Sequence, residues 1–198
     1  MSSEHLAKAN SLFLSKKFQD ACFEYDIVLQ LEPANIEALN NKGYALSKLK
    51  KYQDALECYE MALKIAPNDK SVLVNKISAL RKTKRYDDAM VYCQQILKSK
   101  PDDNITLYHM ERILYSLGKF AESISCCDKI LYHYQDNAEV LLDRAASLAR
   151  LGKTDDTLAT LSRCIKANPK LKFKISNNSA FSHLAENPAF VRIISESP

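Results

Sequence analysis

Five basic residues recur at a constant spacing of 34 residues and form the clearest pattern in the chain that could do chemistry. These residues, which we call the basic ridge, are Lys17, Lys51, Arg85, Lys119 and Lys153. A line of cations along one edge of a molecule attracts the phosphates of a nucleic acid or the carboxylates of an acidic protein. The simpler interpretation is a solvated turn residue that recurs with the period. Both interpretations stay open at this point.

The histidines and cysteines form no pattern that is typical of an enzyme or a metal site. The four histidines are scattered, and the six cysteines include no Cys-x-x-Cys pair. The chain has no glycine-rich phosphate loop, no His-Glu-x-x-His motif and no nucleophile elbow. We therefore expect no catalytic residues, no metal and no cofactor. We interpret the cysteines as packed thiols in a reducing, cytoplasmic protein.

The composition indicates a soluble helical protein. Of 198 residues, 46% are hydrophobic and 26% are charged, the net charge is +4, and only three residues are glycine. No apolar run is long enough to cross a bilayer, and the N-terminus has no basic segment followed by an apolar one. We expect one domain over residues 1–198, with no membrane partner and no signal peptide.

A unit of 34 residues repeats five times without a gap, and it positions the basic ridge. The repeats cover residues 2–35, 36–69, 70–103, 104–137 and 138–171. In the second repeat the pattern residues are Leu39, Gly43, Leu46, Tyr52, Ala55, Tyr59, Ala62 and Pro67. One leucine recurs in all five repeats, as Leu12, Leu46, Leu80, Leu114 and Leu148. A fixed period of this size indicates a stack of repeats.

Each repeat is predicted to form two helices joined by a tight turn. In the second repeat, helical periodicity predicts helices over residues 36–49 and 52–65, with the turn at Lys50 and Lys51. Pro67 ends the second helix, and Asp69 can cap the helix that follows. The remaining residues, 172–198, are too apolar for a disordered tail. We expect them to form capping helices near residues 179–186 and from Pro188, covering the last repeat.

The repeat resembles the tetratricopeptide repeat (TPR) family in its register of small, aromatic and proline residues. This resemblance covers most of the chain, up to about residue 171. It implies an all-α, right-handed superhelical solenoid of helix-turn-helix repeats with a concave groove lined by the first helix of each repeat. It also implies a non-catalytic scaffold that binds other proteins, although the fold alone does not identify a partner.

The groove positions that the resemblance implies combine amides with tyrosines. The residues predicted to bind a peptide are Asn10, Asn41, Tyr44, Asn75, Tyr108, His109, Arg112 and Tyr115. An amide side chain can pair with an extended peptide backbone in both directions, and tyrosine supplies contact area at low entropy cost. The alternative is that the asparagines reflect only the average sequence of the repeat.

Some TPR domains hold the C-terminal carboxylates of chaperone tails, but this chain lacks most of that clamp. Asn10 and Asn41 match two clamp positions, whereas Leu6, Ser71 and Asn75 stand where cations are needed. A carboxylate would therefore lack its charge-assisted partners, so we do not expect a standard chaperone clamp. Arg81, Lys82 and Arg112 remain candidates for holding an acidic ligand in another way.

The sequence thus favours a scaffold that buries a peptide or helix of a partner protein in its groove. The first alternative is binding of a nucleic acid or acidic partner along the basic ridge. No aromatic residues interleave with the ridge, so single-stranded nucleic acid is disfavoured. The second alternative is self-association through the ends of the array, with the apolar segment around Phe190 as its candidate surface.

Overall fold

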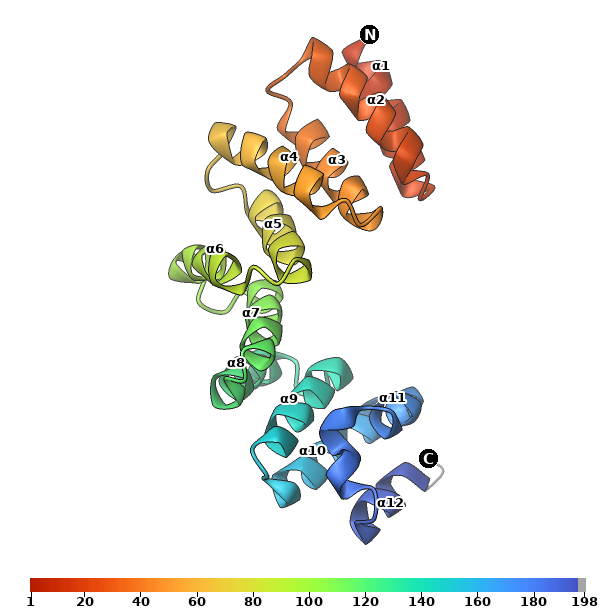
Figure 1. Cartoon of the computed structure of the whole chain (residues 1–198), viewed down its shortest axis with the longest axis vertical. Coiled ribbons are helices and arrows are strands. Elements are labelled where there is room, and N and C mark those ends of the chain that lie inside the picture. Colours follow the sequence, from red (N-terminus) through yellow and green to blue (C-terminus); the bar gives the residue numbers. More distant parts are fainter. Residues whose placement is uncertain (196–198) are drawn as a thin grey trace. The chain divides into compact units, whose positions relative to one another are not determined.

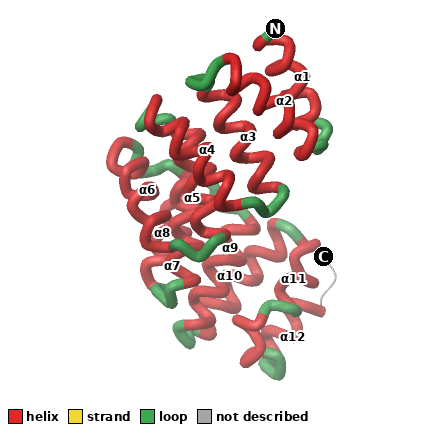
Figure 2. The backbone as a smooth tube through the Cα atoms, turned by 45° about the horizontal axis from the view of Figure 1, so that its top comes forward, coloured by secondary structure: helices red, strands yellow, loops and turns green. Residues whose placement is uncertain are grey.

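The computed structural model describes residues 1–195, which form helices and short loops without a strand (Figures 1 and 2). The five repeats form the helices α1 (Ser2–Leu14), α2 (Phe18–Leu31), α3 (Ile36–Lys48), α4 (Tyr52–Ile65), α5 (Lys70–Lys82), α6 (Tyr86–Ser99), α7 (Asn104–Ser116), α8 (Phe120–His133), α9 (Ala138–Arg150) and α10 (Thr154–Ala167). The fold is therefore an all-α array of helix-turn-helix repeats, as predicted. None of the described helices is long and apolar enough to cross a membrane.

The first helix of every repeat ends in the same hydrogen-bonded turn. In the second repeat, Lys50 N donates to Ser47 O at 3.1 Å and Lys51 N donates to Leu46 O at 2.9 Å. This pair of bonds is a Schellman motif, and it needs a left-handed residue just after the helix. That residue has φ of 60° to 75° in Lys16, Lys50, Lys84, Gly118 and Gly152. The recurring leucine thus supplies a backbone carbonyl to the turn as well as an apolar side chain.

The next repeat begins where an Asn or Asp side chain caps its first helix. The caps recur every 34 residues as Asn35, Asp69, Asp103 and Asn137. Each side chain accepts a hydrogen bond from the backbone N–H three residues later, such as Asp69 Oδ1 from Val72 N at 3.0 Å. These bonds satisfy N–H groups that the helix itself leaves unpaired. The predicted role of Asp69 is confirmed.

One pair of positions sets how closely the two helices of a repeat approach. A β-carbon on Gly43 would lie 2.5 Å from Cε1 of Tyr59, so only glycine fits against this ring. At the same two positions, the other repeats have buried pairs of different volume. These pairs are Ala9 with Tyr25, Ile77 with Cys93, Glu111 with Cys127, and Ala145 with Leu161. Large side chains thus alternate between the two helices.

The fourth repeat has a polar core at the position where a small residue is expected. The carboxylate of Glu111 is buried and accepts a hydrogen bond from Ser123 Oγ at 3.3 Å. Ser123 Oγ also lies 2.9 Å from Ser147 Oγ. Cys127 stands where the second repeat has Tyr59, and its smaller volume leaves room for Glu111. The glutamate is therefore accommodated by hydrogen-bonding and smaller neighbours.

The chain divides into two compact units, unit 1 (Met1–Ser99) and unit 2 (Lys100–Pro198). In unit 1 the first helices of the repeats are neighbours, because α3 contacts both α1 and α5. In unit 2, α7 contacts α9 in the same way. We call the row α1, α3, α5 the first-helix face of unit 1, and the pair α7, α9 the first-helix face of unit 2. The single-domain organisation stays a prediction.

The C-terminal segment covers α9 and α10, but with more and shorter elements than predicted. It consists of η1 (Pro169–Leu171), α11 (Lys172–Ser176), η2 (Ser179–Leu184) and α12 (Pro188–Ser195). The helix expected over residues 179–186 is a short 3₁₀-helix, which Asn178 caps through a bond from Ala180 N. Residues 196–198, the end of the expected cap, lie outside the described residues.

The apolar residues of this segment are not all used in packing. Phe181 and Phe190 are buried, with ring centroids 6.3 Å apart. Phe190 is therefore occupied in the cap, which removes it as the candidate surface for self-association. Phe173, in contrast, is 81% exposed and takes no part in the cap.

Candidate functional site

Hydrogen bonds link the predicted asparagines of unit 1 across neighbouring first helices. Asn10 Oδ1 on α1 accepts from Asn41 Nδ2 on α3 at 3.2 Å and from Tyr25 OH at 2.7 Å. Burial raises the pKa of Tyr25 to about 12, so its phenol stays protonated and donates. Asn10 Nδ2 in turn donates to Glu37 Oε1 at 2.8 Å. Both lone pairs of the Asn10 oxygen are used, so a peptide can contact Asn10 only through its amide N–H.

Asn75 on α5 extends this amide row to the third repeat. Its Nδ2 donates to Asn40 Oδ1 on α3 at 2.9 Å, and Asn75 is half-buried. The asparagines therefore join adjacent first helices as well as offering polar groups on the face. This structural role is one that the repeat pattern alone did not indicate.

Tyr44 lies in the same face and is also partly used by the fold. Its ring centroid is 5.3 Å from that of Phe13 on α1, and Lys48 Nζ lies 4.9 Å from the ring centroid. The side chain is half-buried, so part of the ring remains accessible. Tyr44 thus has a fixed orientation, which lowers the entropy cost of its contact with a ligand.

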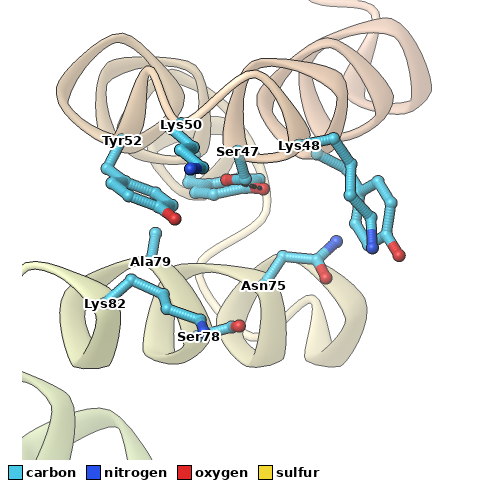
Figure 3. Close-up of a pocket in the computed structure, with 10 residues that line it drawn as sticks. Ser47, Lys48, Lys50, Tyr52, Asn75, Ser78, Ala79 and Lys82 are labelled. Carbon is cyan, nitrogen blue, oxygen red and sulfur yellow. Dashed lines mark hydrogen bonds between the residues drawn. The ribbon is translucent and has the colours of Figure 1, made fainter. Parts of the chain in front are cut away.

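A hollow of about 320 Å³ lies between α3 and α5 in unit 1 (Figure 3). It is lined by Tyr44, Ser47, Lys48, Lys50, Tyr52, Tyr59, Asn75, Ser78, Ala79 and Lys82. Two of the predicted groove residues, Tyr44 and Asn75, are in its wall. The hollow is cationic, because three lysines and no acidic residue line it.

The predicted residues of unit 2 form a stacked ion pair on the first-helix face. Arg112 Nη2 lies 2.8 Å from Asp143 Oδ2, and the guanidinium carbon is 4.6 Å from the ring centroid of Tyr108. Arg112 and Tyr108 are on α7, and Asp143 is on α9. Arg112 is therefore compensated by Asp143 and held over an aromatic ring, so it is a weak candidate for binding an acidic ligand.

The charge states in this cluster follow from burial and from the partner. Burial raises the pKa of the Asp143 carboxyl above its ordinary value, and the Arg112 guanidinium opposes that rise. Although burial favours the neutral form of Arg112, Asp143 holds the pKa of this guanidinium above its ordinary value. Burial also raises the pKa of Tyr108, so the phenol stays neutral beside the pair.

The other two predicted residues of unit 2 are half-buried on α7. The ring centroid of Tyr115 lies 5.3 Å from that of Phe120, where α8 begins. The ring of His109 lies 6.3 Å from that of Tyr108. A second hollow of about 420 Å³ adjoins this face and is mainly apolar, with Ile105, Tyr108 and Val140 in its wall. Unit 2 thus offers an aromatic and apolar surface.

All five residues of the basic ridge are exposed on inner turns, three in unit 1 and two in unit 2. Lys17, Lys51, Lys119 and Lys153 are N-cap residues whose side chains make no capping bond. Lysine is a poor N-cap, since it cannot accept a hydrogen bond from the first turn. Arg85 differs because its Nε pairs with Asp88 Oδ2 at 2.8 Å.

Sequence reasoning placed Ser47, Lys48, Ser78 and Lys82 among groove positions but did not bring them together with Lys50. Lys50 follows the helix and has a left-handed backbone with φ of 62°. Only the turn geometry carries it into the same hollow as α5. The nearest signal in the sequence is the serine that replaces an aromatic residue at two equivalent positions, Ser47 for Phe13 and Ser78 for Tyr44.

Two family models match the repeats that the geometry defines. Both describe the tetratricopeptide repeat; one matches residues 36–69 and the other residues 139–170. The chain is a tetratricopeptide repeat protein. TPR proteins are in general non-catalytic scaffolds for protein interactions. A search of curated proteins found no match.

Solved structures share the TPR fold at low sequence identity. A tetratricopeptide repeat protein from Parabacteroides merdae is 19% identical, with a TM-score of 0.83 over 97% of this chain and 77% of that chain. MamA from Desulfovibrio magneticus is 18% identical, with a TM-score of 0.74 over 90% and 97%. YrrB, described as a TPR protein with an unusual peptide-binding site, is 19% identical, with a TM-score of 0.70 over 83% and 85%. These similarities establish the fold.

Proposed function

We propose that this TPR protein is a non-catalytic scaffold that binds a peptide or helix of a partner protein on its first-helix faces. The observation that carries the proposal is the hollow between α3 and α5, where the predicted residues Tyr44 and Asn75 meet. A concave site with fixed aromatic and amide groups is typical of a peptide-binding surface. The peptide-binding site described for YrrB gives further support for this class of ligand.

The proposed mechanism separates contact area from polar recognition. Tyr44 in unit 1 and Tyr108 in unit 2 supply rigid ring surface, while Asn10 and Asn75 offer amide groups to the peptide backbone. Few of these contacts should dominate the affinity, because binding energy concentrates in a small number of anchors. The amide row is already hydrogen-bonded between helices, so the face needs little reordering when a ligand binds.

A peptide selected from a library tests the proposal before the natural partner is identified. An unphosphorylated random peptide library is selected on the full chain, and the dissociation constants of enriched peptides are measured by fluorescence anisotropy. Tyr44→Ala, Asn75→Ala and Tyr108→Ala are compared with Phe23→Ala, which truncates an exposed aromatic residue of α2. Thermal unfolding of each variant identifies any loss of folding.

We expect at least one first-helix variant to weaken binding by about tenfold or more, which is the effect of one lost anchor. Phe23→Ala should leave the affinity unchanged, because α2 is a second helix of its repeat. Equal affinities for all folded variants, or a loss only in Phe23→Ala, would overturn the proposal.

The basic ridge supports a second candidate function, binding of an acidic partner or a nucleic acid. The supporting observation is that lysines occupy four N-cap positions where they bring no capping bond. Its test compares binding of a heparin column or a generic oligonucleotide to wild type and Lys17→Gln/Lys51→Gln. Steep salt dependence that the variant reduces would support it. A flat salt response would exclude it.

The cytoplasmic location is likewise a proposal, supported by the thiols. All six cysteines are free and buried in the structure. Burial raises the pKa of the thiols of Cys58 and Cys126 to about 11, which disfavours the reactive thiolate. Buried thiols at core positions suit a reducing compartment, where they persist without pairing.

A further inference from the structure

The hollow between α3 and α5 holds three cations that the protein does not neutralise. Lys48, Lys50 and Lys82 line it, and among residues 1–195 no ion pair involves any of the three. Other cations of unit 1 have carboxylate partners, in the pairs Lys8–Glu24, Lys42–Asp26 and Lys76–Glu60. Like charges gathered in one concavity focus a positive potential and favour an anion there.

Neutral hydrogen-bonding groups complete the wall. The hydroxyls of Ser47, Tyr52 and Ser78 and the amide of Asn75 all line the hollow. Figure 3 shows Lys50 and Tyr52 reaching from one side toward α5, where Lys82 extends along the helix toward Ser78. Donors on both walls suit a ligand with several acceptor oxygens.

The hollow exists because small polar residues replace aromatic rings at two repeat positions. Between α1 and α3, the corresponding positions are Phe13 and Tyr44, whose ring centroids are 5.3 Å apart and fill the space. Between α3 and α5 they are Ser47 and Ser78. At the position of Lys48, the first repeat has Leu14. The same interface is therefore filled and apolar in one place, and open and cationic in the other.

We propose that this hollow binds a phosphoserine or phosphothreonine side chain of the partner peptide. The proposal rests on the proposed function, since the peptide would lie on the first-helix face of unit 1. A phosphate group carries nearly two negative charges at neutral pH and three acceptor oxygens, which match three lysines and a ring of donors better than one carboxylate does. A nucleic acid backbone presents a row of phosphates instead, whereas the hollow is a single cluster between two helices.

The test uses a short phosphopeptide that carries no other anchor. Acetyl-Gly-Gly-phosphoserine-Gly-Gly-amide is titrated into the full chain, and backbone amide shifts are followed by NMR. The serine and glutamate versions of the peptide, and inorganic phosphate, form the comparison arms. We expect saturable shifts around residues 47–50 and 78–82 with the phosphopeptide, and weaker binding of the glutamate peptide. Inorganic phosphate binding as tightly as the phosphopeptide would overturn the peptide-borne source and leave a free-anion site.

Two variants and a matched control identify the hollow as the site. Lys48→Gln/Lys82→Gln should weaken the phosphopeptide by roughly tenfold or more, since two charge-assisted contacts are lost. Lys64→Gln/Lys98→Gln removes the same charge from exposed lysines of α4 and α6 and should leave the affinity unchanged. Ser47→Phe/Ser78→Tyr copies the filled interface of the first repeat, keeps every lysine, and should also abolish binding.

Three outcomes would overturn the inference: no shifts in the hollow, equal losses in the control variant, or full binding when the hollow is filled. Failure here is separate from failure of the proposed function, because the library that tests that function contains no phosphate. Unphosphorylated peptides that bind through Tyr44 would uphold the scaffold even if the phosphopeptide did not bind. Phosphopeptide binding without any selected peptide would show the reverse.

Discussion

At the residue scale, Gly43 and Tyr59 share a space that holds only one large side chain. Replacing Gly43 with alanine would bring its β-carbon to 2.5 Å from Cε1 of Tyr59 and 2.9 Å from Cζ. We expect Gly43→Ala to destabilise the protein by about 1–3 kcal/mol, the usual cost of overpacking a core. Urea unfolding followed by circular dichroism would measure this loss.

A second substitution tests whether the loss comes from this contact. The third repeat has Ile77 and Cys93 at the same two positions. Tyr59→Cys in the Gly43→Ala background should therefore show a favourable interaction energy in a double-mutant cycle. Additive losses in the cycle would show that the two positions do not trade volume.

Glu24 provides a residue-scale prediction about pH. This buried carboxylate contacts His5 Nδ1 at 2.7 Å and Lys8 Nζ at 2.6 Å. The hydrogen bond with His5, and then that with Lys8, hold its pKa below the ordinary value. A carboxyl with a lowered pKa in the folded state adds stability above its unfolded pKa, and this stability is lost as the pH falls through the folded pKa.

Glu24→Gln should consequently be less stable than wild type near pH 7, with a difference that shrinks as the pH falls below about 4. Urea midpoints of both proteins between pH 3 and 7 would measure the effect. A constant difference over that range would contradict the lowered pKa. Glu4→Gln is the matched control, because Glu4 is exposed on the same end of α1.

At the element scale, the inner turn repeats with one geometry but two kinds of residue. Lys84 adopts φ of 61° and Gly152 adopts φ of 72° at equivalent positions. A left-handed backbone strains lysine but not glycine. We expect Lys84→Gly to stabilise the protein by about 0.5–1 kcal/mol and Gly152→Ala to destabilise it by about 1 kcal/mol. Thermal or urea unfolding measures both, and a destabilised Lys84→Gly would contradict the turn geometry.

The helices of the repeats could be predicted from the sequence because each end has a local cause. Asp69 caps α5 as expected, and the predicted helix over residues 52–65 has the same bounds in the structure. The first helix of that repeat ends at Lys48, one residue earlier than predicted, since Lys50 must enter the left-handed turn. Local hydrogen bonds decide these boundaries, and their residue types are visible in the sequence.

The C-terminal segment and the site could be predicted less completely, because both depend on contacts distant in the sequence. Phe173 is as apolar as Phe181, yet only Phe181 is buried against the array. The hydrogen bond from Asn41 to Asn10 joins two repeats, and it changes what the amides can offer a peptide. The hollow likewise depends on Ser47 and Ser78, which are in different repeats. Periodicity identifies the face but not its unoccupied space.

At the scale of the whole molecule, the two units offer different chemistry on their first-helix faces. Unit 1 has a cationic hollow with hydroxyl and amide groups, whereas unit 2 has a compensated Arg112–Asp143 pair beside an apolar hollow. A partner segment with an anionic side chain fits the first face, and an apolar segment fits the second. The net charge of +4 is modest, so binding at these faces should depend on salt less steeply than binding along the basic ridge.

The measurement that tests the first-helix face most directly is hydroxyl-radical footprinting of the full chain, with and without a saturating selected peptide. Oxidation of Tyr44 on α3 is compared with that of Phe23 on α2, an exposed aromatic residue of the same unit. Burial of the peptide on the first-helix face predicts a lower oxidation rate of Tyr44 and an unchanged rate of Phe23. Protection of Phe23 with Tyr44 unchanged would contradict it.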